Sequence, residues 1–317
     1  MSEPLAWTSF AIAMRTRFRG ISAREGMLAL GPQGWTEWSP FWDYDAAESA
    51  TWLAAAHEAA FEPWPTPLRT RIPVNCTVPA VGPGRARQAV LTSGGCRTAK
   101  VKVAEPGQTL SDDVARVEAV AEALGAGGRV RVDANGGWSV DAAVDAIGVL
   151  NRAVGGLEYV EQPCATVEEL ARVRRRVEVP IAADESIRRA ADPMRVRELE
   201  AADVAVLKVQ PIGGVHACLR VAEQIGLPVV VSSALETSVG LAAGLALAAA
   251  LPELPFACGL NTLSLLDGDV TADPLRVEDG TMQVRRPAAD PDLLRRYTSP
   301  ELPGRWDERL AATRAAR

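Results

Sequence analysis

From about residue 71 onward, the chain alternates short apolar runs with longer stretches rich in Ala, Glu and Arg. This alternation is typical of β-α-β units that build a parallel sheet. Eight runs are candidate strands, and they begin near Val74, Val101, Val130, Leu157, Ile181, Val204, Val229 and Phe256. Eight strands are the number that closes a barrel. The uncharged run at residues 238–251 is too short to span a membrane and predicts a buried barrel helix.

The first 70 residues follow a different pattern. Residues 10–18 alternate apolar with small or basic side chains, as in a half-buried antiparallel strand, and a tight connection at 19–21 leads to a second strand near 24–31. An Ala-rich helix is predicted over 45–61, and the Pro-rich residues 62–67 end it. We therefore expect a small α+β domain ahead of the barrel.

The end of the chain is expected to return to this N-terminal domain. No long amphipathic helix follows the eighth strand at once, and residues 275–284 predict a hairpin that joins the N-terminal sheet. The last ~20 residues are charged and Pro-containing, and the sequence does not determine whether they are ordered. The predicted fold class is α/β: a (β/α)7β TIM-like barrel (71–272) with an N-terminal α+β capping domain (1–70) that is completed by the C-terminal segment (273–317).

Charged residues end five consecutive predicted strands. They are Lys102, Asp133, Glu161, Asp184 and Lys208, and by subtraction they are 31, 28, 23 and 24 residues apart, about one strand and helix each time. The C-terminal ends of barrel strands face one bowl, so we expect these side chains to converge. Taken singly, each acid could be a salt-bridge partner, but together three carboxylates suit a hard cation such as Mg2+, with Mn2+ as a possible substitute.

The three lysines of the chain all lie in predicted barrel strands. Lys100 and Lys102 are two residues apart, so both point to the same face of their strand. An inward ammonium group needs a counter-charge, and its pKa falls beside another cation, which makes it a candidate base. A metal ion between opposed lysines suits removal of a proton next to a carboxylate, because the enediolate that forms must be stabilised.

Several motifs resemble a known family at this point. The segments KVK at 100–102, DANGGW from Asp133, EQP from Glu161, DES from Asp184 and LKVQPIGG around Lys208 resemble the muconate-lactonizing branch of the enolase superfamily. GWTEWSPF (34–41) and SSALETSVGL (232–241) are similar to the o-succinylbenzoate synthase family of menaquinone biosynthesis. The resemblance covers nearly the whole chain. It implies dehydration of 2-succinyl-6-hydroxy-2,4-cyclohexadiene-1-carboxylate to 2-succinylbenzoate through an enediolate.

The resemblance also implies roles for these residues. Asp133, Glu161 and Asp184 would bind Mg2+, and one of Lys102 and Lys208 would remove the α-proton. In a synthase, Lys102 would return a proton to the leaving hydroxyl, and Lys208 would stabilise the intermediate by its charge.

The resemblance implies supporting roles for further residues. Lys100 would tune the Lys102 ammonium group, and Asn135 would hold a water molecule or support the metal ligands. Candidate contacts to the succinyl arm are Ser232, Ser233 and the turn formed by Gly259, Leu260, Asn261 and Thr262. The sequence departs from related enzymes at two places. The short turn at 19–21 leaves little room for a mobile capping loop, so the site is expected to be open. The segment CGLNT lacks the D-x-D pair of related dipeptide epimerases.

Other functions use the same residues. An N-acylamino acid racemase would need the same two lysines, one on each face, and a muconate cycloisomerase would share the site as well. A Schiff-base lyase would use Lys102 or Lys208 covalently and leave the acids structural. A barrel without catalytic activity that only binds is a further alternative.

The composition of the chain limits the kinds of molecule that it is expected to bind. A net charge of -6 and a pI near 5.2 provide no basic surface for nucleic acid, so the expected partner is a small-molecule carboxylate. The start MSEPLAW lacks the basic region of a secretory signal, and no membrane span is predicted. Five scattered cysteines fit reduced thiols, as expected in the cytoplasm. The sequence predicts no oligomeric state.

Overall fold

Eight parallel strands form a closed barrel in the computed structural model, which describes residues 5–189 and 192–316. The acidic start of the chain, residues 1–4, lies outside the described residues. Neighbouring strands pair in chain order, β11 pairs with β4, and a bridge between Ser232 and Gly259 closes the ring. The strands are β4 (Arg71–Val78), β5 (Thr98–Lys102), β6 (Arg129–Asp133), β7 (Leu157–Glu161), β8 (Ile181–Ala183), β9 (Val204–Leu207), β10 (Val229–Val231) and β11 (Cys258–Asn261). All eight strands predicted from the sequence are confirmed.

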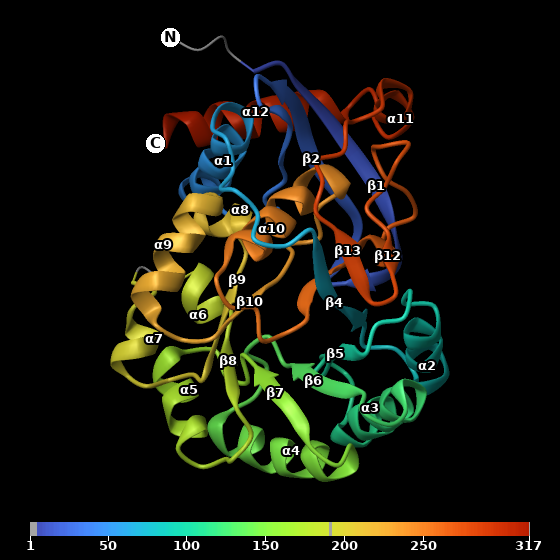
Figure 1. The fold of residues 1–317 in the computed structure, drawn as a ribbon, viewed down its shortest axis with the longest axis vertical. Helices are drawn as coiled ribbons and strands as arrows, with labels where there is room; N and C mark the ends of the chain where they lie inside the picture. The colour runs from blue at the N-terminus through green and yellow to red at the C-terminus, as the bar shows by residue number, and fades with distance from the viewer. Residues whose placement is uncertain (1–4, 190–191, 317) are drawn as a thin grey trace.

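Helices follow the first seven barrel strands and cover the outside of the barrel (Figure 1). They are α2 (Pro83–Leu91), α3 (Leu110–Leu124), α4 (Val140–Ala153), α5 (Val167–Arg174), α6 (Glu185–Arg188), α7 (Arg195–Glu198), α8 (Val209–Ile212), α9 (Val215–Ile225) and α10 (Ser238–Ala250). A short 3-10 turn, η1 (Leu263–Leu265), is the element that directly follows β11. Residues 238–249 of α10 are all buried, as its uniformly apolar sequence predicts. The (β/α)7β class is therefore confirmed.

The capping domain lies over one end of the barrel, at the top of Figure 1. Its antiparallel sheet contains β1 (Trp7–Phe18), β2 (Ile21–Gly31) and β3 (Gly34–Trp38), of which β3 was not predicted as a strand. Helix α1 (Ala46–Phe61) begins with a capping box between Asp45 and Glu48. The turn between β1 and β2 places Arg19 and Gly20 at positive φ.

The C-terminal segment differs from the prediction in the partner of its hairpin. The hairpin β12 (Val277–Glu278) and β13 (Thr281–Gln283) forms, but its predicted return to the N-terminal sheet is wrong because β13 pairs with residues 71–73 of β4. These residues precede the part of β4 that pairs with β5, so their edge is free for the hairpin. Beyond it lie two helices, α11 (Pro291–Arg296) and α12 (Leu302–Ala315), for which the sequence analysis made no prediction.

Helix α12 packs against the capping domain and not against the barrel wall. The Trp306 ring lies 5.4 Å from the Trp38 ring, nearly perpendicular to it. These two residues share a buried cluster with Trp52 and with Leu235 of the barrel, so one core joins the capping domain to the barrel.

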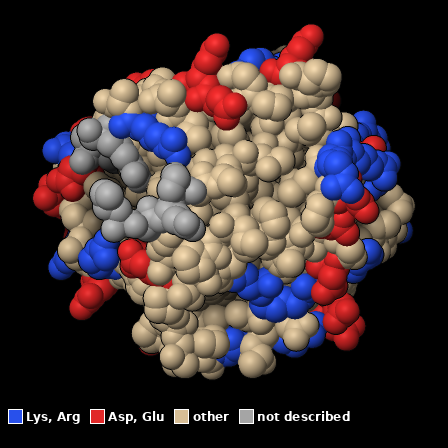
Figure 2. Space-filling model, turned by 90° about the horizontal axis from the view of Figure 1, so that it is seen from above, with Lys and Arg blue, Asp and Glu red and all other residues tan. Residues whose placement is uncertain are grey.

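The outer face of this end is mixed in charge. Figure 2, viewed from above, shows acidic and basic side chains around a central area that has neither. Among the described residues, no helix is long and apolar enough to cross a membrane.

Candidate active site

The five charged strand-end residues occupy adjacent positions around the barrel. Lys102, Asp133 and Glu161 are the last residues of β5, β6 and β7, and the strand register pairs Lys102 with Asp133 and Asp133 with Glu161. Asp184 follows β8 directly. Lys208, predicted inside a strand, is instead the first residue after β9.

Three lysine ammonium groups contact three buried carboxylates. Lys100 Nζ lies 2.7 Å from Glu161 Oε1 and 3.1 Å from Asp133 Oδ2. Lys102 Nζ lies 2.7 Å from the same Asp133 oxygen and also bonds Asn135. Lys208 Nζ lies 2.6 Å from Asp184 Oδ2. None of the three lysine side chains is more than 12% exposed, so each ammonium group points inward.

The carboxylates differ in how readily they ionise. Burial and the neighbouring Asp133 charge raise the pKa of Glu161 to about 7. Burial also opposes ionisation of Asp133 and Asp184, but the nearby cations outweigh it. Lys102 and Lys100 hold the pKa of Asp133 well below its usual range, and Arg188 and Lys208 lower the pKa of Asp184 to about 2.

The lysines also differ in pKa. Burial lowers the pKa of Lys208, and the nearby Arg188 and Lys100 charges add to this effect despite Asp184. Burial acts in the same direction on Lys100, but the carboxylates of Glu161 and Asp133 outweigh it and raise its pKa. Lys100 is therefore a fixed cation, whereas Lys208 releases its proton more readily than an exposed lysine.

The carboxylates of Asp133, Glu161 and Asp184 have the chemistry that a hard cation prefers, because they supply only oxygen ligands. Their mutual repulsion, seen in the raised pKa of Glu161, is what a divalent ion would relieve. In the described part of the chain, however, no group of three or more His, Cys, Asp or Glu side chains is arranged to hold a metal ion. Lysine ammonium groups contact all three acids in this conformation.

Arg188 is a site residue that the sequence analysis missed. It lies on α6, four residues after Asp184, and its Nε donates to Asp184 Oδ1 at 2.9 Å. It also bonds Glu185 and the Tyr44 hydroxyl of the capping domain. Its only signal in the sequence is the i,i+4 spacing from an acid on a short helix.

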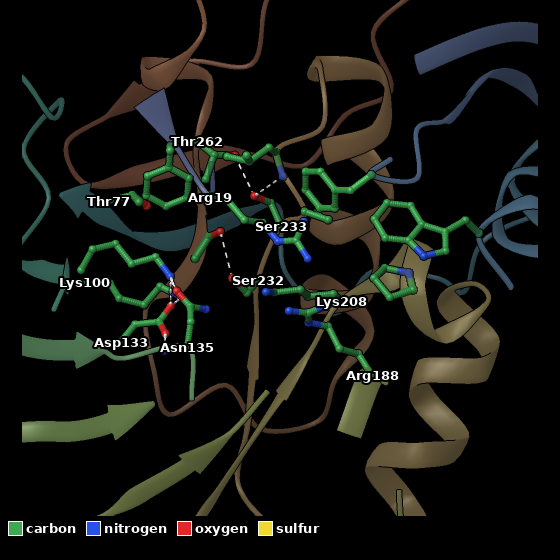
Figure 3. A pocket seen from close by; sticks show the side chains of 18 residues that line it. Arg19, Thr77, Lys100, Asp133, Asn135, Arg188, Lys208, Ser232, Ser233 and Thr262 are labelled. Carbon is green, nitrogen blue, oxygen red and sulfur yellow. Dashed lines mark hydrogen bonds and ion pairs between the residues drawn. The ribbon is translucent and has the colours of Figure 1, made fainter. Parts of the chain in front are cut away.

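A pocket opens above these charges (Figure 3). Lys100, Asp133 and Asn135 lie on one side of it, and Lys208 and Arg188 lie on the other. Asn135 adopts a left-handed conformation, φ 45°, which brings its amide beside Lys102 and Glu185.

The substrate contacts predicted at β10 and β11 are only partly brought together. Ser232, Ser233, Gly259 and Thr262 line the pocket, and the Ser233 and Thr262 hydroxyls lie 2.7 Å apart. Asn261 does not line it. Its side chain donates to the Ser93 carbonyl and lines a different cavity, so the structure does not bring Asn261 to the pocket with the other predicted contacts.

The capping domain supplies the remaining wall. Phe18, Arg19, Phe41 and Trp52 line the pocket. The short turn was expected to leave the site open, but it places Phe18 and Arg19 over the barrel, and the Lys102 ammonium lies 5.4 Å from the Phe18 ring centre. The short turn therefore still reaches the bowl, and the greater openness of the site stays a prediction.

Comparisons with known proteins agree with this architecture. Residues 84–292 match the family described as "Enolase C-terminal domain-like", and residues 9–60 match "Enolase N-terminal domain-like". An o-succinylbenzoate synthase from Thermobifida fusca is 64% identical over 97% of this chain and 96% of its own length. The chain belongs to the o-succinylbenzoate synthase family of the enolase superfamily.

Other members of the o-succinylbenzoate synthase family match over nearly the full chain. The enzyme of that name from Mycolicibacterium smegmatis is 56% identical over 96% of this chain and 94% of its own length. Among solved structures, a muconate lactonizing enzyme from Pseudomonas fluorescens is 20% identical, covers 93% of this chain and 98% of its own, and superposes with a TM-score of 0.80. That likeness shows the shared fold alone.

Proposed function

We propose that this protein is an o-succinylbenzoate synthase, a hydro-lyase that converts 2-succinyl-6-hydroxy-2,4-cyclohexadiene-1-carboxylate to 2-succinylbenzoate and water in menaquinone biosynthesis. The observation that carries the proposal is the 64% identity to an enzyme of that name over 97% of the chain. The inward lysines around three acids support it, because this reaction requires a base and a charge-stabilised enediolate.

The proposed mechanism uses the lysines in different roles. Lys102 removes the proton next to the ring carboxylate, and the C–H electrons enter the enediolate. As the enediolate collapses, the C–O bond to the ring hydroxyl breaks, Lys102 returns its proton to that oxygen, and water leaves. Lys208 stabilises the enediolate by its charge, and Lys100, held by Glu161 and Asp133, tunes Lys102 through its own charge.

Asp133, Glu161 and Asp184 are the residues that would hold Mg2+, with Mn2+ as a possible substitute. The bound ion would supply charge to offset the negative oxygens of the substrate carboxylate. Because each acid contacts a lysine in the structure, metal binding would open at least some of these contacts.

The decisive experiment is a dehydration assay with and without a chelator. We expect turnover that EDTA abolishes and added Mg2+ restores. A Schiff-base lyase would instead resist the chelator and be trapped on Lys102 or Lys208 by borohydride in the presence of substrate. Absence of turnover with Mg2+ present would refute the proposal.

The second candidate reaction is N-acylamino acid racemization, because Lys102 contacts Asp133 whereas Lys208 contacts Asp184. Two separately held bases could serve the two faces of one carbon. A parallel assay with N-succinyl amino acids, compared by kcat/KM with the dehydration, separates the two activities.

A cytoplasmic location is also proposed, and the five free, buried cysteines are compatible with it.

A further inference from the structure

A cluster of buried charged residues joins the capping domain to the barrel outside the catalytic bowl. Arg24 lies on β2, Glu37 on β3 and Glu236 on the loop between β10 and α10, and none is more than 4% exposed. Charged side chains are rarely buried this fully unless they are paired and hydrogen-bonded. The catalytic mechanism uses none of the three.

Arg24 contacts the pocket wall directly. Its Nε donates to the Leu235 carbonyl at 3.1 Å and its Nη2 to the Ala234 carbonyl at 3.2 Å. Ala234 and Leu235 both line the pocket. Leu235 has a φ of 65°, a left-handed conformation that is unfavourable for a branched side chain and needs support from its surroundings.

Glu37 holds the other end of the same loop. One of its oxygens accepts hydrogen bonds from the Thr237 N–H, the Thr237 hydroxyl and the Gly240 N–H, at 3.1, 2.5 and 3.1 Å. A carboxylate from the capping domain therefore caps the N-terminus of barrel helix α10.

Ser39 links the two charged residues. Its hydroxyl accepts from Arg24 Nη2 at 2.8 Å and donates to the other oxygen of Glu37 at 2.7 Å. Residues 234–237 are thus held at both ends by one network from β2, β3 and Ser39. Arg24 also stacks on Phe41, which lines the pocket from the capping side.

We propose that Arg24 and Glu37 are positioning residues, which fix the loop of residues 234–237 as part of the substrate pocket wall and thereby control substrate affinity. This inference rests on the proposed function. It assigns to the capping domain a contribution to affinity through the backbone of the barrel as well as through its own contacts in the pocket.

The chain offers a matched control for the test. Asp269 also caps the N-terminus of α10, because it accepts from the Ser238 N–H and hydroxyl, but no hydrogen bond of its side chain reaches residues 234–237. Glu37→Gln and Asp269→Asn each weaken a carboxylate cap on one helix. Only Glu37→Gln also disturbs the loop.

The experiment measures kcat, KM and Tm for the dehydration in wild type and variants. Glu37→Gln is expected to raise KM about tenfold with kcat within about twofold, because ground-state binding is lost and the chemistry is not. Ser39→Ala, a milder change, is expected to raise KM about threefold. Asp269→Asn is expected to lower Tm while KM stays at the wild-type value.

Two outcomes would overturn the inference. One is an unchanged KM in Glu37→Gln, or in Ser39→Ala if Glu37→Gln does not fold. The other is an equal rise of KM in Asp269→Asn, which would make helix stability the cause. Both presuppose an active wild type, whereas an inactive wild type would refute the proposed function itself.

Discussion

At the scale of single residues, the site is defined by how each ammonium group is paired. Lys100 is shared between two acids and its pKa is raised, whereas Lys208 contacts Asp184 alone and its pKa is lowered. Neighbouring lysines can therefore differ in proton affinity within one bowl. That difference suits Lys100 to a purely electrostatic role.

Replacement of Lys102 by Ala should reduce kcat for dehydration at least about 100-fold, because a positioned acid or base typically contributes that much. Product binding should change far less, since the other charges of the pocket remain. The measurement is steady-state kinetics together with a binding titration of 2-succinylbenzoate. Arg87→Ala, which removes an exposed ion pair on α2, is the control and should retain wild-type kcat. A wild-type kcat in Lys102→Ala would exclude the assigned role.

Asp184→Asn should chiefly weaken the response to Mg2+, because it removes one of three proposed ligand charges. We expect at least a tenfold rise in the Mg2+ concentration for half-maximal activity. The neighbouring acid Glu185 also contacts Arg188 but is not a proposed ligand, so Glu185→Gln should shift this concentration much less. Equal Mg2+ dependence in wild type and Asp184→Asn would contradict the assignment.

Sequence patterns predicted the catalytic charges but not the residues that support them. Lys102, Asp133 and Glu161 were predicted because a charge at the end of an apolar strand is unusual and recurs at a regular interval. Arg24 and Glu37 gave no such signal, since charged residues on a half-buried strand are normally assigned to its exposed face. Their burial follows from the docking of β2 and β3 on another domain.

At the scale of elements, helix α10 shows how closely the two domains approach. A Cβ atom on Gly240 would lie 2.6 Å from Glu236 Cβ and 2.8 Å from Glu37 Oε2. Real Cβ atoms essentially never come this close to other atoms, so glycine is required there by Glu236 of the barrel loop before the helix together with Glu37 of the capping domain.

Gly240→Ala should therefore destabilise the protein by about 1–3 kcal/mol through overpacking, against the usual preference of helices for Ala. Gly148→Ala in the interior of α4 is the matched control. Its nearest neighbour would be the flexible end of Arg152 at 3.5 Å, so it should stabilise by roughly 0.5–1 kcal/mol. Urea unfolding of both variants checks the opposite signs, and a stabilised Gly240→Ala would disprove the close approach.

Elements that depend on local pattern were predictable, and those that depend on tertiary pairing were not. All eight barrel strands follow from apolar runs. The hairpin at 277–283 pairs with β4 and not with the N-terminal sheet, because its own sequence does not specify which strand it pairs with. Helix α12 has Pro303 and Gly304 in its first turn and is highly charged, so its packing through Leu302, Trp306 and Leu310 defines it.

At the scale of the whole molecule, the junction between the domains should make stability depend on pH. Burial raises the pKa of Glu37 from 4.5 to about 7, although the Arg24 charge opposes this and the nearby Glu236 charge adds to it. Between these values the folded state binds more protons at Glu37 than the unfolded state does. Its contribution to stability is therefore fully present below pH 4.5 and is lost as the pH rises through about 7.

Glu37→Gln should remove that contribution. Relative to the variant, the free energy of unfolding of wild type should fall as the pH rises from 4.5 to 7. The difference between the two proteins should stay constant above about pH 8. Urea unfolding of wild type and Glu37→Gln at several pH values measures it. A difference that does not vary with pH would mean that folding does not raise the pKa of Glu37.

The position of α12 also affects the order in which the protein is made. Trp306 donates a hydrogen bond to Glu25, 281 residues earlier in the chain, and packs against Trp38 in the first sheet. At a translation rate of roughly 5–20 residues per second, the first sheet waits about 15–55 seconds on the ribosome for this partner. The eight barrel strands are synthesised before α12, so a nascent chain has all of its catalytic charges before the core that supports the capping domain is complete.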